Sequence, residues 1–370
     1  MRNILVIGGA GFIGSHLVDR LVGLGHKVTV YDSLDSHTHP DGKPPLFLNP
    51  DSVFVKGDIL DYNHIKRIVK DKNVIFHLAS LMDPHQYGIK KFLDTNMGGV
   101  TNLMDILVNS EHCCEKLIFA SSITCYGEGE YECPECGNLI VSDKRSDSDI
   151  DRKKFDFSCE ICAGDLIDKP TVETKYLNPV KTDGLSHKIQ EDIILSLGKS
   201  EKIPVTVLRY SNVYGVRSLM LNPYTWIFPY FVNELMEDRS PEIFEDGNQG
   251  LDFVHVADVV NANILAMDND LSDYNVYNIG SGYKQTVLGL FSEIRDIVNA
   301  QSEPRINYLR NPNDVRHCYL DISKAKQDLS YVPVSDRRSE MIRFVNWLRE
   351  KNSVDIFRSI RPKLNRYGIV

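Results

Sequence analysis

The chain has 370 residues, of which 42% are hydrophobic and 25% are charged, with 24 Gly and 16 Pro. This composition is typical of a large globular protein and excludes a disordered, collagen-like or fibrous chain. The length predicts two domains, or one domain with a sizeable appendage. The formal net charge of −9 gives no reason to expect binding to nucleic acid or to an anionic membrane.

Two further features of the composition bear on the cellular compartment. No apolar run approaches the roughly 20 residues needed to cross a bilayer, and Met1 and Arg2 lead directly into a strand-like segment without a signal-peptide core. We therefore expect a cytoplasmic protein with no membrane partner. Eight cysteines are present, and four of them form two Cys-x-x-Cys pairs. In a reducing compartment such pairs indicate metal or redox chemistry rather than disulfides.

Short β-rich runs alternate with helical patterns in the first part of the chain, which predicts a parallel sheet with crossover helices. The expected strands are 4–7, 28–31, 53–56, 74–77, 117–120 and 205–209. The expected helices between them are 13–24, 62–70, 92–109 and 184–198. The strand-like runs are continuously apolar, as is usual when both faces of a sheet are covered. The fold class is therefore α/β, with a doubly wound parallel sheet.

The segment 128–168 interrupts this alternation, because it is polar, has little periodicity and contains both Cys-x-x-Cys pairs. We interpret it as an insertion between a strand and the next helix. After residue 210 the pattern is mixed, with expected helices at 229–238, 286–299 and 337–351. We therefore predict a first domain of 1–127 and 169–210, an inserted unit of 128–168, and a smaller domain, mainly 211–370, that caps the sheet.

A glycine-rich turn joins the first strand to the first helix, and its sequence is Gly8-Gly-Ala-Gly11-Phe12-Ile13-Gly14. Gly8 allows a tight turn, Gly11 lets the backbone approach a pyrophosphate, and Gly14 permits close packing of the helix on the strand. The start of the helix supplies N–H donors and positive potential. The spacing Gly-x-x-Gly-x-x-Gly differs slightly from the Rossmann fingerprint, so its position between strand and helix carries the interpretation.

Carboxylates follow two of the neighbouring strands. Asp32 ends the second strand, where it can accept hydrogen bonds from a ribose diol and repel a 2′-phosphate, which favours NAD over NADP. Asp58 ends the third strand-like segment. Its carboxylate either faces the adenine edge or caps the following helix.

These segments resemble the extended short-chain dehydrogenase/reductase family, in particular its nucleotide-sugar epimerases and dehydratases. The resemblance covers nearly the whole chain outside the insertion, and it extends to the segments 77–80, 121–127, 209–215, 252–258 and 278–282. It implies a Rossmann domain that binds NAD and a C-terminal domain that binds the nucleoside diphosphate of a sugar. The cofactor contacts that it implies are Gly8, Gly11, Phe12, Ile13, Gly14, Asp32, Asp58, Ile59, Leu78, Ala79, Ser80, Asn96 and His187.

Ser122 matches the family's catalytic Ser/Thr, whose hydroxyl bonds the reacting sugar oxygen, and Tyr126 follows it as an implied substrate contact. The two residues directly after Ser122, Ile123 and Thr124, are not the Asp-Glu pair that 4,6-dehydratases use for elimination. The resemblance therefore favours an epimerase over a dehydratase.

The family's catalytic Tyr and Lys lie four residues apart, on one face of the helix that follows. An ungapped match places Asp183 at the Tyr position and His187 at the Lys position. Three explanations remain open. The two residues form an acid/base dyad, in which His187 has a reference pKa of about 6.5; or they form a solvated ion pair in a binding protein without turnover; or another residue, such as Tyr176, Lys181 or Lys188, enters the site.

The substrate half also departs from the family pattern. Leu251 stands where the family has an Arg that grips the pyrophosphate, so one charge-assisted contact is missing. The remaining candidates for contacts to the phosphates and ribose are Asn212, Arg217, Arg310, Asp314 and Arg316. For Arg217 and Arg316, an exposed charge without a ligand is an equal alternative.

The paired cysteines are Cys133, Cys136, Cys159 and Cys162, with 22 residues between the two pairs. Four thiolates can close tetrahedrally on Zn²⁺, and Gly137 and Gly164 allow the tight turns around the metal. Such a site has no open coordination position, so we expect a structural zinc ribbon. The insertion is too poor in apolar residues for its own core, so metal binding would provide much of its folding energy. Its many carboxylates argue against nucleic-acid binding.

Some 4-epimerases that act on deoxythymidine-diphosphate-rhamnose carry a similar insertion after the Tyr-Gly-Glu-Gly motif, seen here at 126–129. The insertion begins at the end of the strand that contains Ser122 and ends before Asp183. We therefore expect it to lie over the substrate mouth and to shape substrate access. The preferred function is an NAD-dependent epimerase of a nucleotide-diphosphate sugar. A net oxidoreductase, dehydratase or decarboxylase, and a silent binding protein, are the alternatives. The family also implies a homodimer through the helices 92–109 and 184–198.

Overall fold

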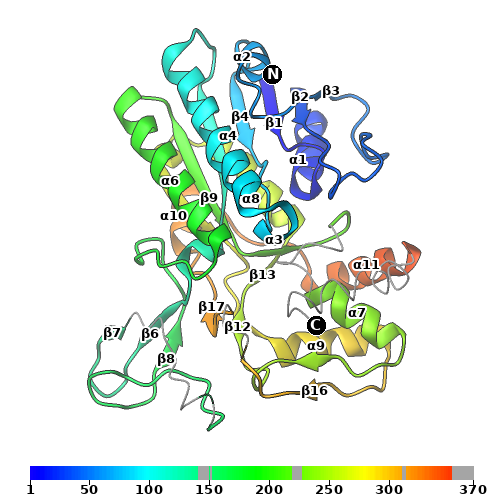
Figure 1. Cartoon of the computed structure of the whole chain (residues 1–370), viewed down its shortest axis with the longest axis vertical. Helices are drawn as coiled ribbons and strands as arrows, with labels where there is room; N and C mark the ends of the chain where they lie inside the picture. The colour runs from blue at the N-terminus through cyan, green and yellow to red at the C-terminus, as the bar shows by residue number, and fades with distance from the viewer. Residues whose placement is uncertain (141–149, 151, 219–226, 311–313, 352–370) are drawn as a thin grey trace.

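The computed structural model describes residues 1–140, 150, 152–218, 227–310 and 314–351. Its centre is a seven-stranded sheet, all parallel, in the order β14-β9-β5-β4-β1-β2-β3. The strands are β1 Asn3–Ile7, β2 Lys27–Asp32, β3 Val53–Lys56, β4 Val74–His77, β5 Lys116–Ser122, β9 Val205–Tyr210 and β14 Asn275–Ile279. The doubly wound architecture expected from the alternating pattern is confirmed (Figure 1).

Helices cover both faces of this sheet. One face packs on α2, α4 and α6, and the other on α1, α8 and α10. Their bounds are α1 Phe12–Gly23, α2 Tyr62–Val69, α4 Ile89–Asn109, α6 Thr182–Glu201, α8 Val256–Asp268 and α10 Ser323–Leu329. Strand β1 shows why its residues are continuously apolar: Leu5 and Ile7 lie in one core, and Ile4 and Val6 lie in the other.

Six expected strands and four expected helices of the first domain are present within a few residues of their predicted ends. The seventh strand, β14, comes from a segment that we placed in the C-terminal domain, so the sheet is completed by a late part of the chain. β14 is an edge strand with one neighbour, β9, yet its Asn278 is fully buried and donates to the Thr171 and Asp321 carbonyls.

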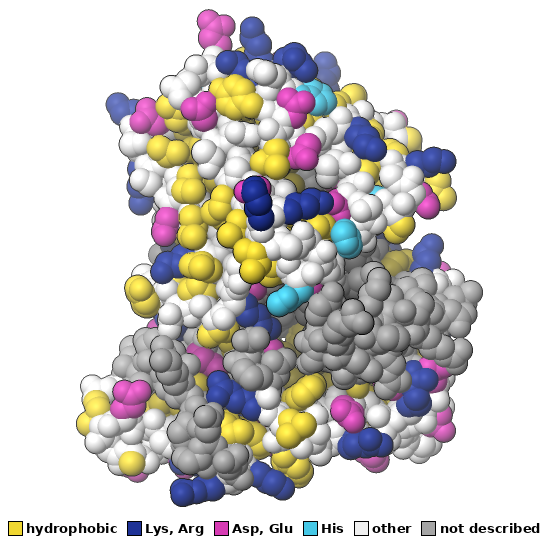
Figure 2. Space-filling view, viewed as in Figure 1, with side chains coloured by type: hydrophobic (Ala, Val, Ile, Leu, Met, Phe, Trp, Pro, Cys, Tyr) yellow, Lys and Arg dark blue, Asp and Glu magenta, His cyan; other side chains and the backbone are white. Residues whose placement is uncertain are grey.

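A second core lies in the C-terminal lobe, among α7 Ile227–Met236, α9 Val287–Val298 and α11 Arg337–Glu350. Short strands support it, in the pairs β10–β13 and β11–β16 and the sheet β15-β12-β17. They are β10 Asn212–Tyr214, β11 Glu242–Ile243, β12 Gly250–Leu251, β13 Phe253–His255, β15 Gln285–Thr286, β16 Arg305–Ile306 and β17 His317–Cys318. On the face in Figure 2, basic and acidic side chains are interspersed, so the net charge is not gathered there in one acidic patch.

The insertion forms a small antiparallel sheet, β7-β6-β8, beside the C-terminal lobe (Figure 1). Its strands are β6 Glu130–Glu132, β7 Leu139–Ile140 and β8 Ile167–Lys169. The expectation that it lacks a core was wrong, because five of its buried residues cluster: Tyr131, Cys133, Phe157, Cys159 and Leu166. We call 128–168 the ribbon.

Both ends of the ribbon are fixed to one stretch of the C-terminal lobe, 317–321. Where the ribbon begins, the Gly129 amide donates to the His317 carbonyl at 2.7 Å. Just beyond its end, the Thr171 amide donates to Tyr319 and the Thr171 carbonyl accepts from Asp321. Among the helices of the described residues, none is both long and apolar enough to span a bilayer.

Candidate functional site

The glycine turn lies where β1 ends and α1 begins, at the carboxyl edge of the sheet. Gly8 has φ +81°, and a Cβ there would lie 2.7 Å from the Ala79 amide nitrogen, which follows β4. A Cβ on Gly14 would lie only 2.2 Å from the Gly8 carbonyl oxygen. Both positions therefore exclude larger residues for the reasons expected from the sequence.

Asp32, at the end of β2, has a carboxylate fixed by two backbone amides. Its Oδ2 accepts from Ala10 at 3.0 Å, within the glycine turn, and its Oδ1 accepts from Leu34 at 2.9 Å. The carboxylate thus lies beside the turn that would hold the pyrophosphate.

Asp58 does not cap α2, because Asp61 accepts from the His64 amide and occupies that position. The Asp58 carboxylate instead accepts from Leu60 at 2.9 Å. Ile59 is buried against α4, where it would meet any Cβ on Gly99 at 2.7 Å.

The segment after β4, which contains Leu78, Ala79 and Ser80, is held by Asn96 of α4. The Asn96 side chain accepts from the Leu81 amide and donates to the Leu81 carbonyl and to the Ser186 hydroxyl of α6. It is buried, and both its amide atoms are engaged. Asn96 therefore positions this segment, and its side chain is already occupied within the protein.

Ser122 ends β5 and caps the short 3₁₀ turn Ile123–Tyr126, accepting from the Thr124 amide and hydroxyl. Tyr126 is fully buried, and its hydroxyl donates to Asn278 at 2.7 Å and accepts from Arg209 at 2.8 Å. This corrects the expectation that Tyr126 contacts substrate, because its ring and hydroxyl are enclosed by the protein.

The start of α6 packs against the turn after Ser122, since a Cβ on Gly184 would lie 2.3 Å from the Thr124 carbonyl oxygen. This contact brings Asp183 and His187 to the same edge as the glycine turn. Both are buried, yet Asp183 Oδ2 and His187 Nδ1 have no hydrogen-bond partner. No hydrogen bond or ion pair joins the two residues among the described contacts, so the dyad geometry is not formed in this state.

Burial lowers the pKa of His187 below its usual value, opposed by the charges of Asp183 and Glu191. Burial also lowers the pKa of the neighbouring His77, at the end of β4, to about 4. Both ring nitrogens of His77 lack partners. Burial thus disfavours the charged form of both imidazoles.

A cavity of about 190 Å³ lies between this edge and the C-terminal lobe. Apolar side chains, among them Leu251, dominate its wall. The polar residues Asn212 and Asp314 also line it. The Asp314 carboxylate accepts from Lys181 at 3.1 Å, and the Asn212 amide donates to the Asp252 carbonyl at 2.8 Å. Arg310 is half-buried, and its Nε has no partner.

Two expected phosphate contacts are engaged elsewhere. Arg217 donates to Asp19 of α1 at 2.8 Å and lies over the Phe47 ring, so it anchors the segment after β10 to the first domain. Arg316 is fully buried among carboxylates at the ribbon. Neither arginine is among the described residues that line the cavity.

The four paired cysteines place their Sγ atoms within 4.8 Å of one another. Cys133 and Cys162 are 3.4 Å apart and Cys136 and Cys159 are 3.7 Å apart, Sγ to Sγ. The two turns are alike, with a left-handed residue directly after each pair: Gly137 at φ +68° and Ala163 at φ +60°. The second turn therefore uses Ala163, where we had expected Gly164.

The comparisons with known proteins agree with this arrangement. The model of the NAD dependent epimerase/dehydratase family matches residues 4–143 and 149–280. The chain belongs to this family.

Individual relatives of the epimerase/dehydratase family cover nearly the whole chain. A Methanocaldococcus jannaschii protein provisionally named UDP-glucose 4-epimerase is 30% identical over 94% of this chain and 99% of its own. The dTDP-L-rhamnose 4-epimerase of Burkholderia thailandensis is 27% identical over 90% of this chain and 91% of its own. The Thermotoga maritima UDP-glucose 4-epimerase, solved with UDP-glucose, has a TM-score of 0.75, with 30% identity over 95% of this chain and 99% of that one.

One buried carboxylate, Glu191, was not predicted from the sequence. Glu191 of α6 receives three hydrogen bonds from Arg209 of β9, at 3.0, 3.2 and 2.6 Å, and one from Ser121 of β5. The pair ties α6 to the sheet one turn beyond His187. An arginine inside an otherwise apolar strand was the available signal, because a buried cation requires a buried acid.

Proposed function

We propose that the protein is an NAD-dependent enzyme that epimerises a nucleotide-diphosphate sugar through a transient keto-sugar. The observation that carries this proposal is the pair of buried, unpartnered groups at the start of α6, Asp183 Oδ2 and His187 Nδ1, where the helix packs on the turn after Ser122. An unpaired buried polar atom costs about 1–3 kcal/mol, so such atoms point to a bound molecule that pairs with them.

The cofactor edge fits NAD. The amides at the start of α1 would hold the pyrophosphate, and Gly8, Gly11 and Gly14 leave room for it. Asp32 would accept from the adenosine ribose, and its negative charge disfavours a 2′-phosphate. The other contacts are the segments 12–13, 58–59 and 78–80, with Asn96 positioning the last. When bound, NAD⁺ supplies the acceptor for the hydride that leaves the sugar carbon.

The chain's own residues supply the proton chemistry. Ser122 donates a hydrogen bond to the reacting sugar oxygen. His187, kept neutral by burial, takes the hydroxyl proton at a ring nitrogen and returns it after the keto-sugar has turned. Asp183 stabilises the imidazolium that forms in between. Asn212 and Asp314, which line the cavity, and Arg310, with its free Nε, bind the nucleoside diphosphate.

The cysteine cluster fits a structural Zn²⁺. Tetrahedral coordination with Zn–S bonds of about 2.3 Å requires sulfur atoms about 3.8 Å apart, and the two closest pairs are 3.4 and 3.7 Å apart. Four thiolates complete the coordination, so the ion would hold the two turns together without binding substrate.

A homodimer is part of this proposal. Helices α4 and α6 pack side by side on one face of the sheet (Figure 1). Leu185 and Ile189, one turn apart on α6, and Ile89 at the start of α4 are exposed. A second copy of the chain would cover these apolar side chains.

The decisive experiment is a panel of UDP- and dTDP-linked sugars incubated with the purified protein and followed by NMR. We expect interconversion of two C4 epimers with no net change in nicotinamide absorbance, and retained NAD⁺ in the protein by mass spectrometry. A product that has lost water or CO₂, or accumulation of NADH, would instead identify a dehydratase, decarboxylase or net oxidoreductase.

A second candidate is a protein that binds NAD and a nucleotide sugar without turning them over. The missing hydrogen bond between Asp183 and His187 favours it, because an unoriented imidazole is a poor proton shuttle. Binding of both ligands with no product from any sugar, and activity gained only in the double variant Asp183→Tyr/His187→Lys, would support this candidate.

A further inference from the structure

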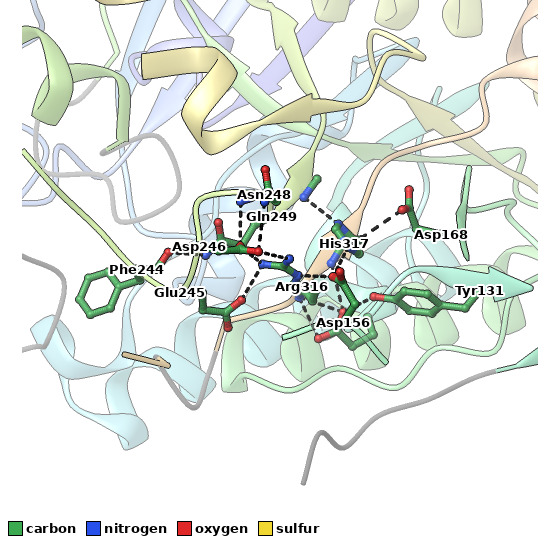
Figure 3. A network of polar contacts seen from close by, with 12 residues as sticks. Tyr131, Asp156, Asp168, Phe244, Glu245, Asp246, Asn248, Gln249, Arg316 and His317 are labelled. Atoms are coloured by element: carbon green, nitrogen blue, oxygen red, sulfur yellow. Dashed lines mark hydrogen bonds and ion pairs between the residues drawn. The ribbon is translucent and has the colours of Figure 1, made fainter. Parts of the chain in front are cut away.

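The stretch Val315–Cys318 lies between the ribbon and the cavity. Val315 and Cys318 line the cavity. Arg316 and His317, between them, reach the ribbon (Figure 3). One short segment therefore has the ribbon on one side and the cavity on the other.

On the ribbon side, a single carboxylate holds both residues. Asp156 Oδ1 accepts from Arg316 Nε at 2.7 Å and lies 3.2 Å from His317 Nε2. Glu128, at the start of the ribbon, accepts from the Arg316 backbone amide at 2.8 and 2.9 Å. Asp156 lies three residues before the metal-binding cysteine Cys159, so its position depends on how that turn is folded.

On the cavity side, the same guanidinium holds a loop. Arg316 Nη1 donates to Glu245 at 3.0 Å, and its two terminal nitrogens grip Asp246 at 2.6 and 3.0 Å. Phe244, directly before these acids, and Gln249, three residues after Asp246, line the cavity. Gln249 Nε2 closes the loop by donating to the Phe244 carbonyl at 2.9 Å.

This loop needs holding. Glu245 has φ +55°, a left-handed conformation that costs a residue with a side chain roughly 1–2 kcal/mol. His317 fixes the far end of the loop, because its Nδ1 accepts from the Gly250 amide at 2.8 Å. The next residue, Leu251, is part of the cavity wall.

We propose that the metal-folded ribbon sets the shape of the substrate cavity through Asp156, Arg316 and His317, so that loading the ribbon with metal raises affinity for the nucleoside diphosphate and leaves NAD binding unchanged. Arg316 and His317 act as positioning residues, and Asp156 is their ribbon partner. The identity of the ligand rests on the proposed function. None of the described ribbon residues lines the cavity, so in the described part of the chain the ribbon reaches it through Val315–Cys318. That the ribbon lies over the substrate mouth stays a prediction.

The test compares two ribbon variants of the full-length protein. Asp156→Asn removes the charge that faces Arg316 with little change in shape. Asp165→Asn is the matched control, because Asp165 is an exposed ribbon carboxylate like Asp156 but pairs with Lys154 instead of Arg316 in the described contacts. Binding of UDP and of dTDP is measured by calorimetry, with bound NAD by mass spectrometry and metal content by plasma mass spectrometry.

We expect Asp156→Asn to weaken diphosphate binding about tenfold, the loss of one charge-assisted contact, with metal and NAD content as in the wild type and Asp165→Asn unchanged. Chelation should weaken the wild type by a similar factor and add little to Asp156→Asn. Full affinity in Asp156→Asn, or an equal loss of NAD, would overturn the proposal.

Hydrogen exchange gives a readout that needs no ligand. When the metal is removed by a chelator, the backbone amides of 244–251 should exchange faster in the wild type. They include the Gly250 amide, which donates a hydrogen bond to His317. Unchanged protection of this loop while the ribbon opens would also overturn the proposal. If the wild type binds neither UDP nor dTDP, the proposed function fails, while the exchange measurement still decides whether the ribbon controls the loop.

Discussion

Buried polar groups differ between two regions of the molecule: the carboxyl edge of the sheet near Asp183 and His187, which we call the edge, and the contacts of Arg316 with the ribbon and the 244–251 loop, which we call the junction. At the edge, Asp183, His187 and His77 have side-chain atoms without partners. At the junction, each side-chain nitrogen of Arg316 donates to a carboxylate. Because unpaired buried groups are costly, the atoms at the edge support the proposed ligand site, whereas the Arg316 guanidinium is fully paired within the chain. We therefore place the proposed chemistry at the edge and a structural role at the junction.

The strongest way to break this comparison is to remove the imidazole at the edge. His187→Ala should lower turnover of the active nucleotide sugar by roughly 10²- to 10⁴-fold, the usual contribution of a positioned acid or base. NMR rates at saturating substrate measure it. The control is Asp192→Ala, at an exposed position further along α6. Equal rates in wild type and His187→Ala would assign the proton transfer to another residue.

Two glycines of α1 differ in their surroundings: Gly14 lies against the glycine turn, and Gly23 has open space around it. Gly14→Ala should cost about 1–3 kcal/mol from overpacking and lower NAD retention, because its Cβ meets the Gly8 carbonyl. Gly23→Ala has open space and should stabilise by up to about 1 kcal/mol. Urea unfolding and mass spectrometry of bound NAD measure both. Similar behaviour of the two variants would contradict the close approach at Gly14.

The unpartnered imidazole of His77 predicts a pH effect on stability. Its folded pKa of about 4 lies below the unfolded value of 6.5, so the unfolded state gains a proton first as pH falls. Stability is therefore present above pH 6.5 and is lost between about pH 6.5 and 4, with a slope of up to about 1.4 kcal/mol per pH unit. The free energy of unfolding of His77→Leu should fall less steeply in this window. Parallel curves would refute it.

The smallest effect is expected in the ribbon, where the two cysteine turns provide a reciprocal pair. Ala163→Gly removes a side chain from a left-handed position and should stabilise the metal-bound ribbon by about 0.5–1 kcal/mol. Gly137→Ala should destabilise it by a similar amount. Metal release to a competing chelator measures both. The same sign of effect in both variants would show that the two turns are not equivalent.

Much of the fold could be predicted because its signals are local. Runs of apolar residues fixed six strands, and the glycine spacing located the turn whose close contacts Gly8 and Gly14 explain. Strand β14 escaped prediction because two Asn residues interrupt its apolar pattern, and only tertiary contacts pair the buried one, Asn278. The left-handed position of Ala163 had no signal of its own, since only the likeness of the two Cys-x-x-Cys turns reveals it.

The direction of side chains could not be predicted in the same way. Tyr126 and Arg316 lie in the right segments for substrate contacts, but Arg209 and Asn278 enclose the first and acids from distant loops enclose the second. Those partners are separated by up to 160 residues in the chain. A motif fixes where a residue lies along the backbone, and only tertiary packing determines what it faces.

The closed base of the ribbon has a consequence for how this chain could have been assembled. Gly129 and Thr171 both bond to the 317–321 stretch, so the backbone leaves and re-enters the body of the protein at nearly the same place. A segment with such adjoining ends can be gained or lost as one piece without changing the register of the seven-stranded sheet. The ribbon is in this sense a module whose two attachment points lie together, although Glu128 and Asp156 also tie it to Arg316.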